Sequence, residues 1–139
     1  MDGRGVATLD DEVHYDDPAR HLVRRSALRL KLLDHSTTGA IVAVATSSLP
    51  EHVGGVRNWD YRYTWVRDAA FSTYVLRGIG LLSEADAFLR WTLTCAERDG
   101  KPSIMYTLVG GQPGEETEDP DSEGWSGSAP VPWGNGAAG

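Results

Sequence analysis

The sequence predicts a mainly α-helical fold with short extended segments, and three observations lead to this class. Apolar residues recur at helical spacing within residues 18–34, 68–79 and 83–98. Glycine or proline stands at the boundaries of these segments, as is typical of helix ends. β-branched or alternating runs occur only in brief stretches, near residues 40–45, 57–65 and 103–109. The order helix, loop, helix, helix suggests an architecture of helical hairpins.

The composition limits the class of protein. A chain of 139 residues is long enough for one modest domain. Its net charge of −7 argues against binding to nucleic acid or to an anionic membrane, because both need clustered cations. Five basic residues do cluster, and we interpret them as the solvated side of one helix: Arg20, Arg24, Arg25, Arg29 and Lys31.

Cysteine, histidine and hydropathy exclude further kinds of site. Cys95 is the single cysteine, so no internal disulfide forms, and its apolar helical context predicts a buried packing thiol. The four histidines (His14, His21, His35, His52) lack metal-like spacing, so we expect no metal. No residue pattern leads us to expect a cofactor. No apolar run approaches the ~20 residues that span a bilayer. Because the first 17 residues also lack a basic and apolar leader pattern, we expect a cytoplasmic protein.

The first predicted helix covers residues 18–34. It follows Asp16-Asp17-Pro18, an acid and proline arrangement that favours a helix start. An apolar stripe then runs along one face, made by Val23, Ala27, Leu30 and Leu33. The preceding residues 1–16 are polar and acidic, and we expect them to be irregular.

Two more helices follow the central part of the chain. From Asp68 to Gly78 the residues are apolar on most sides, with Phe71, Val75 and Ile79 in one stripe, which predicts a buried helix. Ser83 and Asp86 resemble a capping box that begins the third helix. One face of that helix is predicted from Ala85, Phe88, Leu89, Thr92, Cys95 and Ala96, and it ends at Asp99-Gly100.

Extended segments connect the helices. Residues 37–48 contain Ile41, Val42 and Val44 and predict a short buried strand or extended segment. Residues 103–109, "SIMYTLV", predict a second strand-like piece. Beyond them no periodicity remains, which indicates either a long loop or a segment that awaits a partner.

Aromatic and polar residues alternate in residues 57–69, "RNWDYRYTWVRDA". On a strand, the rings of Trp59, Tyr61, Tyr63 and Trp65 share one face. One interpretation is a half-buried strand whose aromatic face is core. The alternative is a sugar site, because rings cover the apolar faces of a pyranose while Arg67 and Asp68 offer donors and acceptors to neighbouring hydroxyls. From the residues alone, Arg67-Asp68 is equally well a helix cap with a surface ion pair.

The segment "TTGAIVAVATSSLPEHVGGVRNWDYRYTWVRDAAF", residues 37–71, resembles bacterial members of glycoside hydrolase family 15, which are glucoamylases, glucodextranases and some trehalases. "RRSALRLKLL", "EADAFLRWTL" and "IMY" resemble the same family, so the resemblance covers residues 18–139. It implies an (α/α)6 barrel. It also implies that Tyr61 and Trp65 pack against a terminal glucose while Arg67 and Asp68 hold its hydroxyls. Trp59 and Tyr63 are interpreted as packing residues.

The resemblance also shows what this sequence does not contain. Such enzymes hydrolyse with inversion through a glutamic acid and a glutamate base, the acid in a Trp-Glu context, and no Trp-Glu pair occurs here. We therefore assign no catalytic residue. The run Glu115, Glu116, Glu118, Asp119, Asp121 and Glu123 is interpreted as a solvated loop. In "GSAPVPWGNGAAG", residues 127–139, Ala129 and Pro132 stand where the family pattern has arginines.

These points lead to one expectation with two alternatives. Residues 1–17 are expected to be an irregular segment and residues 18–139 a partial barrel, incomplete at the C-terminus. The substrate is expected to be an oligosaccharide or disaccharide α-glucoside, and the isolated chain is expected to be inactive. The alternatives are a non-catalytic sugar-binding protein and an inactive remnant. The residues do not distinguish glucoamylase from trehalase or glucodextranase, and they do not indicate an oligomeric state.

Overall fold

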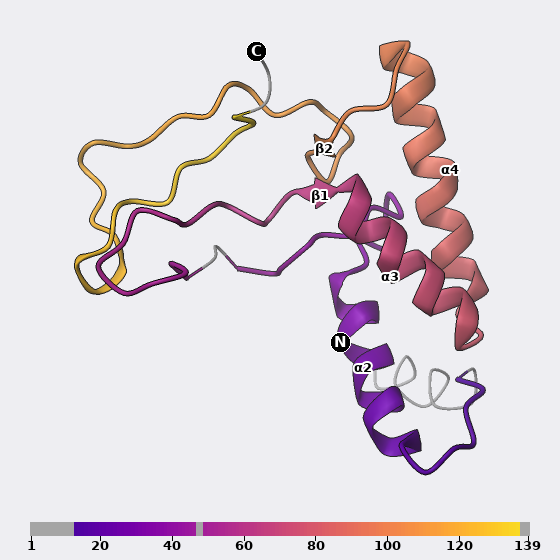
Figure 1. Ribbon diagram of the computed structural model, residues 1–139. Coiled ribbons are helices and arrows are strands. Elements are labelled where there is room, and N and C mark those ends of the chain that lie inside the picture. Colours follow the sequence, from indigo (N-terminus) through magenta and orange to yellow (C-terminus); the bar gives the residue numbers. More distant parts are fainter. Residues whose placement is uncertain (1–12, 47–48, 137–139) are drawn as a thin grey trace.

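A computed structural model describes residues 13–46 and 49–136 of the chain. Its helices are α2 (Arg20–Leu33), α3 (Val66–Gly78) and α4 (Leu82–Asp99), and a short 3-10 turn, η1, covers Trp125–Gly127. Strands β1 (Thr64–Trp65) and β2 (Met105–Tyr106) pair antiparallel. Helices α3 and α4 lie side by side as a hairpin, and long loops extend away from them (Figure 1). The predicted mainly helical class is confirmed.

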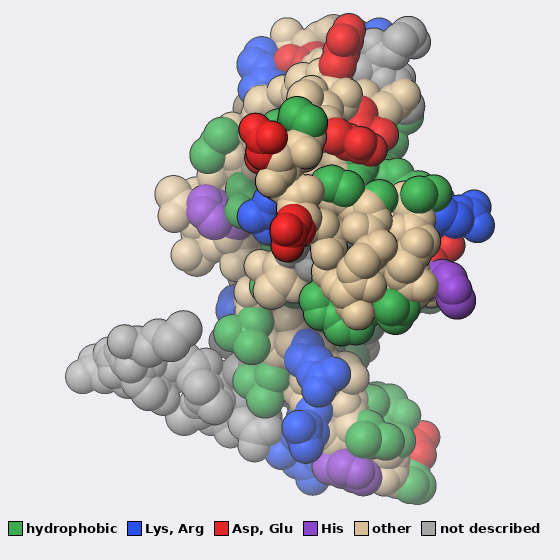
Figure 2. All heavy atoms as spheres, turned by 90° about the vertical axis from the view of Figure 1, so that its left-hand side faces the viewer, with side chains coloured by type: hydrophobic (Ala, Val, Ile, Leu, Met, Phe, Trp, Pro, Cys, Tyr) green, Lys and Arg blue, Asp and Glu red, His purple; other side chains and the backbone are tan. Residues whose placement is uncertain are grey.

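Helix α2 follows its predicted apolar stripe. The amide of Arg20 donates to the carbonyl of Asp17 (2.9 Å), so the chain turns into the helix just after Pro18. Ala27 is fully buried, and the other stripe residues, Val23, Leu30 and Leu33, pack against the core. Basic side chains lie along the outer surface of this helix (Figure 2). Lys31 differs from them because its ammonium pairs with the buried carboxylate of Glu84 on α4.

Helix α4 begins and packs differently from the prediction. It starts at Leu82 without a side-chain cap, so the capping box at Ser83 is wrong. The Ser83 hydroxyl instead donates to Glu84 (2.7 Å), and Asp86 pairs with Arg77 (2.9 Å). The buried apolar face consists of Ala85, Phe88, Trp91 and Cys95. Leu89, predicted on this face, points outward with 52% of its surface exposed.

Helix α3 is not the buried helix that its composition predicts. Ala69, Leu76 and Ile79 face the core, whereas Phe71 and Tyr74 are 70% and 79% exposed. The reason is geometric: within the described residues the helices packed against α3 are α4 and, more weakly, α2, and they cover one side of it. An apolar face is therefore left in contact with water.

Extended segments surround the hairpin. Ala40 and Ile41 are buried, and Ile41 forms a bridge with Asp34, but residues 37–46 form no regular strand. The second half of this segment runs alongside residues 61–63, since the amides of Ala43 and Val44 donate to the carbonyls of Tyr63 and Tyr61 (both 3.1 Å). The predicted strand within residues 103–109 is confirmed as β2.

Both ends of the described chain return to the rest of the fold. The amide of His14 donates to the carbonyl of Ile79 (3.0 Å), and Val13 enters the core, although residues 13–17 are irregular as predicted. Residues 1–12, expected to be irregular, lie outside the described residues. The loop after β2 folds back on itself through paired hydrogen bonds between Thr117 and Trp133 (2.8 and 3.0 Å). No helix among the described residues is long and apolar enough to cross a membrane.

Candidate carbohydrate site

The alternating stretch is buried on its polar side and partly exposed on its aromatic side. Asn58, Asp60 and Thr64 are buried. The rings remain partly exposed and lie outside the core cluster: Trp59, Tyr61, Tyr63 and Trp65. The interpretation of a strand with its aromatic face in the core is therefore wrong. Only Thr64 and Trp65 have strand geometry, as β1.

Two hydrogen bonds fasten this stretch to the C-terminal loop. The side-chain amide of Asn58 donates to the carbonyl of Ala129 (2.8 Å). The backbone amide of Asp60 donates to the carbonyl of Pro132 (3.3 Å). Of the buried polar side chains, Asn58 is thus bonded through its amide nitrogen and Asp60 through Arg62, whereas Asn58 Oδ1 and Thr64 Oγ1 have no hydrogen-bond partner among the described residues.

Asp60 is held by Arg62. The guanidinium donates to both carboxylate oxygens, with Nε to Oδ1 at 2.9 Å and Nη2 to Oδ2 at 2.7 Å. The Arg62 amide adds a third bond at 2.9 Å. Burial works to raise the pKa of Asp60, but the hydrogen bonds from Arg62 outweigh it and the pKa is lowered. Asp60 is therefore an ionised structural carboxylate, unsuited to donate a proton.

A cleft of about 190 Å³ opens beside two of the rings. Its apolar walls are Trp59, Trp65, Ile104 and Pro132, and its polar groups come from Asp60, Glu116 and Asn135. The Tyr61 and Trp65 rings lie 6.0 Å apart at 51°. The Trp65 indole Nε1 is buried and has no hydrogen-bond partner within the described part of the chain. Apolar walls with a few polar groups are typical of a small-molecule site.

The Arg67-Asp68 pair lies outside this cleft. Both residues belong to the first turn of α3, and Nη2 of Arg67 is 3.7 Å from Oδ2 of Asp68. The two side chains are 81% and 47% exposed. Asp68 is the third residue of the helix, so the helix-cap interpretation is wrong, while the exposed surface pair remains. Its carboxylate still interacts favourably with the helix dipole.

The structure thus brings some predicted site residues together and separates others. Tyr61 and Trp65 form one aromatic pair, and Arg67 and Asp68 form one ion pair, but of these four only Trp65 lines the cleft. Trp59, interpreted as a packing residue, lines the cleft as well. Sequence reasoning did not assign the other cleft residues to a site: Ile104 stands next to β2, and Glu116, Pro132 and Asn135 come from the long loop with no periodicity.

The acidic run is a solvated loop, as predicted. Its residues are exposed, except for Asp119, which accepts hydrogen bonds from the Asp121 amide (3.0 Å) and the Ser122 hydroxyl (3.1 Å). Glu116 alone reaches the cleft. Among the residues that the structure describes, no three His, Cys, Asp or Glu side chains lie close enough to hold a metal ion.

The described site thus consists of four partly exposed rings, followed in the sequence by an exposed Arg-Asp pair at the start of a helix. A profile of glycosyl hydrolases family 15 matches residues 17–139, and the chain belongs to this family. No solved structure gives a significant match.

Relatives of known name agree with the family. The chain is 44% identical over 121 residues to a trehalase from Thermoplasma acidophilum, covering 87% of this chain and 21% of that protein. It is 41% identical over 126 residues to a trehalase from Mycolicibacterium smegmatis, covering 88% of this chain and 19% of the relative. Trehalase 1 from Sulfolobus acidocaldarius is 41% identical over 108 residues, which are 76% of this chain and 19% of the relative. The chain spans about a fifth of the length of these relatives.

Proposed function

We propose that this chain supplies the segment of a trehalase-type glycoside hydrolase that binds a terminal glucose unit. The observation that carries the proposal is the partly exposed aromatic pair Tyr61 and Trp65, which the exposed Arg67 and Asp68 follow in the sequence. Aromatic faces would cover the apolar face of the sugar, while the guanidinium and carboxylate would hold its hydroxyls.

The names of the relatives direct the proposal towards a disaccharide α-glucoside and away from glucoamylase specificity. Six relatives that match significantly are trehalases. In a disaccharide with two linked glucose units, one ring would contact Trp65 and the other would lie towards the leaving-group side. The sequence by itself left this choice open.

The wider architecture is also a proposal. We propose that residues 18–139 form part of an (α/α)6 barrel. The exposed apolar face of α3, with Phe71 and Tyr74, supports it, because further helical hairpins would cover such a face. Burial of apolar area is the main favourable term in folding, at about 25 cal/mol per Å².

The mechanism proposed for the whole enzyme is hydrolysis with inversion and without a redox cofactor. A carboxylic acid protonates the glycosidic oxygen while a separate carboxylate activates a water on the opposite face of the ring. The described carboxylates do not fit these roles. Asp60 is kept ionised by Arg62, and Glu116 stands on an exposed loop. We therefore propose no catalytic role for the two carboxylates that line the cleft, Asp60 and Glu116.

Tryptophan fluorescence of the chain, titrated with glucose, maltose and trehalose, tests the binding role. We expect saturable changes with glucose and trehalose that are lost in Trp65→Ala and weakened at least severalfold in Arg67→Ala and Asp68→Asn. Trp125→Ala is the matched control, because Trp125 is also exposed but lies in the distant 3-10 turn. Equal effects of Trp65→Ala and Trp125→Ala, or no saturable change in the unaltered chain, would contradict the proposal.

A non-catalytic sugar-binding protein, or an inactive remnant, is the second candidate. Two observations favour it. Pro132 occupies the cleft wall where the family pattern has an arginine, and Ala129 contributes only backbone contacts, to Gly55 and Asn58. Both proposals expect this chain to bind sugar without releasing glucose from trehalose, so hydrolysis must be measured on the whole protein, where binding without glucose release would support a binding protein. Absence of both would support a remnant.

A further inference from the structure

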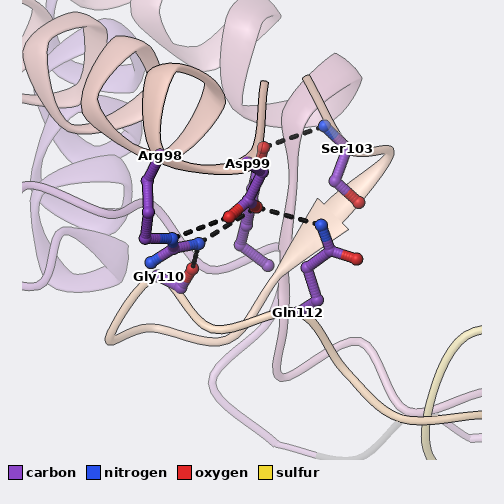
Figure 3. A network of polar contacts seen from close by, with 6 residues as sticks. Arg98, Asp99, Ser103, Gly110 and Gln112 are labelled. Carbon is purple, nitrogen blue, oxygen red and sulfur yellow. Dashed lines mark hydrogen bonds and ion pairs between the residues drawn. The ribbon is translucent and has the colours of Figure 1, made fainter. Parts of the chain in front are cut away.

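A polar network closes the C-terminal end of α4, and the proposed sugar site does not use it. Arg98 donates to Asp99 through Nε (2.7 Å) and Nη2 (3.0 Å), and Nη2 also donates to the carbonyl of Gly110 (2.6 Å). Gln112 donates to the same carboxylate at 3.0 Å (Figure 3). The network thus fastens the loop of residues 103–112 to the end of the helix.

The same loop is seated closely on the inner face of α4. Gly110 has φ of +86°, and a Cβ placed on it would lie 2.9 Å from the Cys95 sulfur. The amide of Thr107 donates to the carbonyl of Gly111 (2.8 Å), and the amide of Gly110 donates to the carbonyl of Thr107 (2.9 Å). Because the loop is tight and closely packed, it has little freedom to move by itself. We therefore expect its position to depend on the clamp, which is the set of hydrogen bonds among Arg98, Asp99 and Gln112.

The loop in turn pairs with the segment that carries Trp65. It carries β2, whose Met105 and Tyr106 are fully buried and lie opposite Trp65 and Thr64 in the ladder. The amide of Val66, the first residue of α3, donates to the carbonyl of Ile104 (3.0 Å). Among the described residues, β2 is the strand paired with β1, so it sets the position of the Trp65 backbone.

We propose that Asp99 is a positioning residue for the sugar site, acting through the clamp, β2 and β1 on Trp65 and on the start of α3. The sugar-binding part of this proposal rests on the proposed function, whereas the positioning of Trp65 does not. Asp99 accepts from both Arg98 and Gln112, so its removal frees Gln112 and leaves the Gly110 carbonyl as the remaining partner of the Arg98 guanidinium. Residues that act through others in this way hold a site within the narrow tolerances that binding requires.

The charge of Asp99 is suited to this role. The hydrogen bonds from Arg98, and then from Gln112, lower the pKa of Asp99 to about 2. The carboxylate is therefore ionised at neutral pH, and its hydrogen bonds are of the stronger, charge-assisted kind. Asp99→Asn keeps the size of the side chain but removes the charge.

Amide hydrogen exchange of the full chain, read by mass spectrometry of its peptides, tests the positioning. In Asp99→Asn we expect exchange of residues 64–66 and 103–112 to rise about tenfold, as losing a charge-assisted hydrogen bond would produce, with α2 unchanged. Asp86→Asn is the matched control, because Asp86 lies near the start of α4, at the opposite end from the loop, and its ion pair of 2.9 Å is with Arg77 of α3. Asp99→Glu, which keeps the carboxylate, should restore most of the protection.

Titration with glucose and trehalose measures sugar affinity, a quantity that a purely structural role of Asp99 would leave unchanged. Asp99→Asn should lower affinity severalfold at unchanged helix content, and Asp86→Asn should leave it unchanged. Similar exchange in the two variants, a rise spread over α2, or no protection of residues 103–112 in the unaltered chain would overturn the positioning role. If Asp99→Asn loosens residues 64–66 but the unaltered chain binds no sugar, the positioning stands and the proposed function fails.

Discussion

Gly39 offers a sharp test of how the turn after α2 supports the site. Its φ is +82°, and a Cβ placed on it would lie 2.8–2.9 Å from the backbone and Cβ of Ala87 on α4. The turn is closed by the amide of His35, which donates to the carbonyl of Ala40 (2.8 Å). Beyond the turn, the amide of Ala43 donates to the carbonyl of Tyr63. The close contact of Gly39 with Ala87 therefore helps to position the extended segment that lies along the aromatic stretch.

The expected cost of Gly39→Ala has two parts. An alanine in the left-handed region costs roughly 1–2 kcal/mol. The close contacts with Ala87 lie well inside the ~3.5–4.0 Å of ordinary carbon contacts, and relieving such overpacking costs roughly 1–3 kcal/mol. We therefore expect a loss of about 2–5 kcal/mol in unfolding free energy. Gly54→Ala, with φ of +80° and no atom within 4 Å, should lose only the first part.

Thermal unfolding followed by circular dichroism, at concentrations where the chain does not self-associate, compares the two variants. In a domain of this size, 1 kcal/mol lowers the midpoint by roughly 2–8 °C, so Gly39→Ala should unfold clearly below Gly54→Ala. Equal midpoints would refute the reasoning, because they would show that α4 and the turn do not pack as closely as described.

Three further predictions concern charge, reactivity and exposed surface. The folded pKa of Asp99, about 2, lies below its ordinary 3.8, so Asp99 stabilises the fold above about pH 4 and loses this contribution as the pH falls towards 2. Unfolding midpoints of the unaltered chain should show this decline, and Asp99→Asn should lack that part of it. Burial raises the pKa of the Cys95 thiol, so iodoacetamide should label it far more slowly than in denaturant; equal rates would contradict its burial. Phe71→Ser with Tyr74→Ser should reduce hydrophobic-dye binding and self-association without loss of helix content, and unchanged dye binding would show that α3 is covered.

The sequence determined the helices because their signals are local. The stripe of Val23, Ala27, Leu30 and Leu33 and the stops at Gly78 and Gly100 need only near neighbours, and they gave boundaries within two residues for all three helices. The unusual run of residues 57–69 also directed attention to the correct family, since its composition is rare enough to be specific.

The cleft could not be predicted in this way. Its walls join Trp59 and Trp65 to Ile104 and Pro132, which are far apart in the sequence, and Pro132 lies in a segment without periodicity. The error in predicting the buried face of α4 has a similar cause. Trp91 is buried and Leu89 is exposed, the reverse of the prediction for Leu89. The Trp91 ring packs against Tyr106 of β2, with ring centroids 5.6 Å apart. That contact depends on the path of the loop after α4.

What the sequence by itself determined was the type and extent of the helices and the chemistry available in residues 57–69. Only the tertiary structure decided which side of that stretch is buried. A period of two assigns residues to two faces but does not say which face is inward. Here the side-chain amide of Asn58 donates to the carbonyl of Ala129, which is 71 residues further along the chain, so the burial of the polar face involves a contact that the local pattern does not contain.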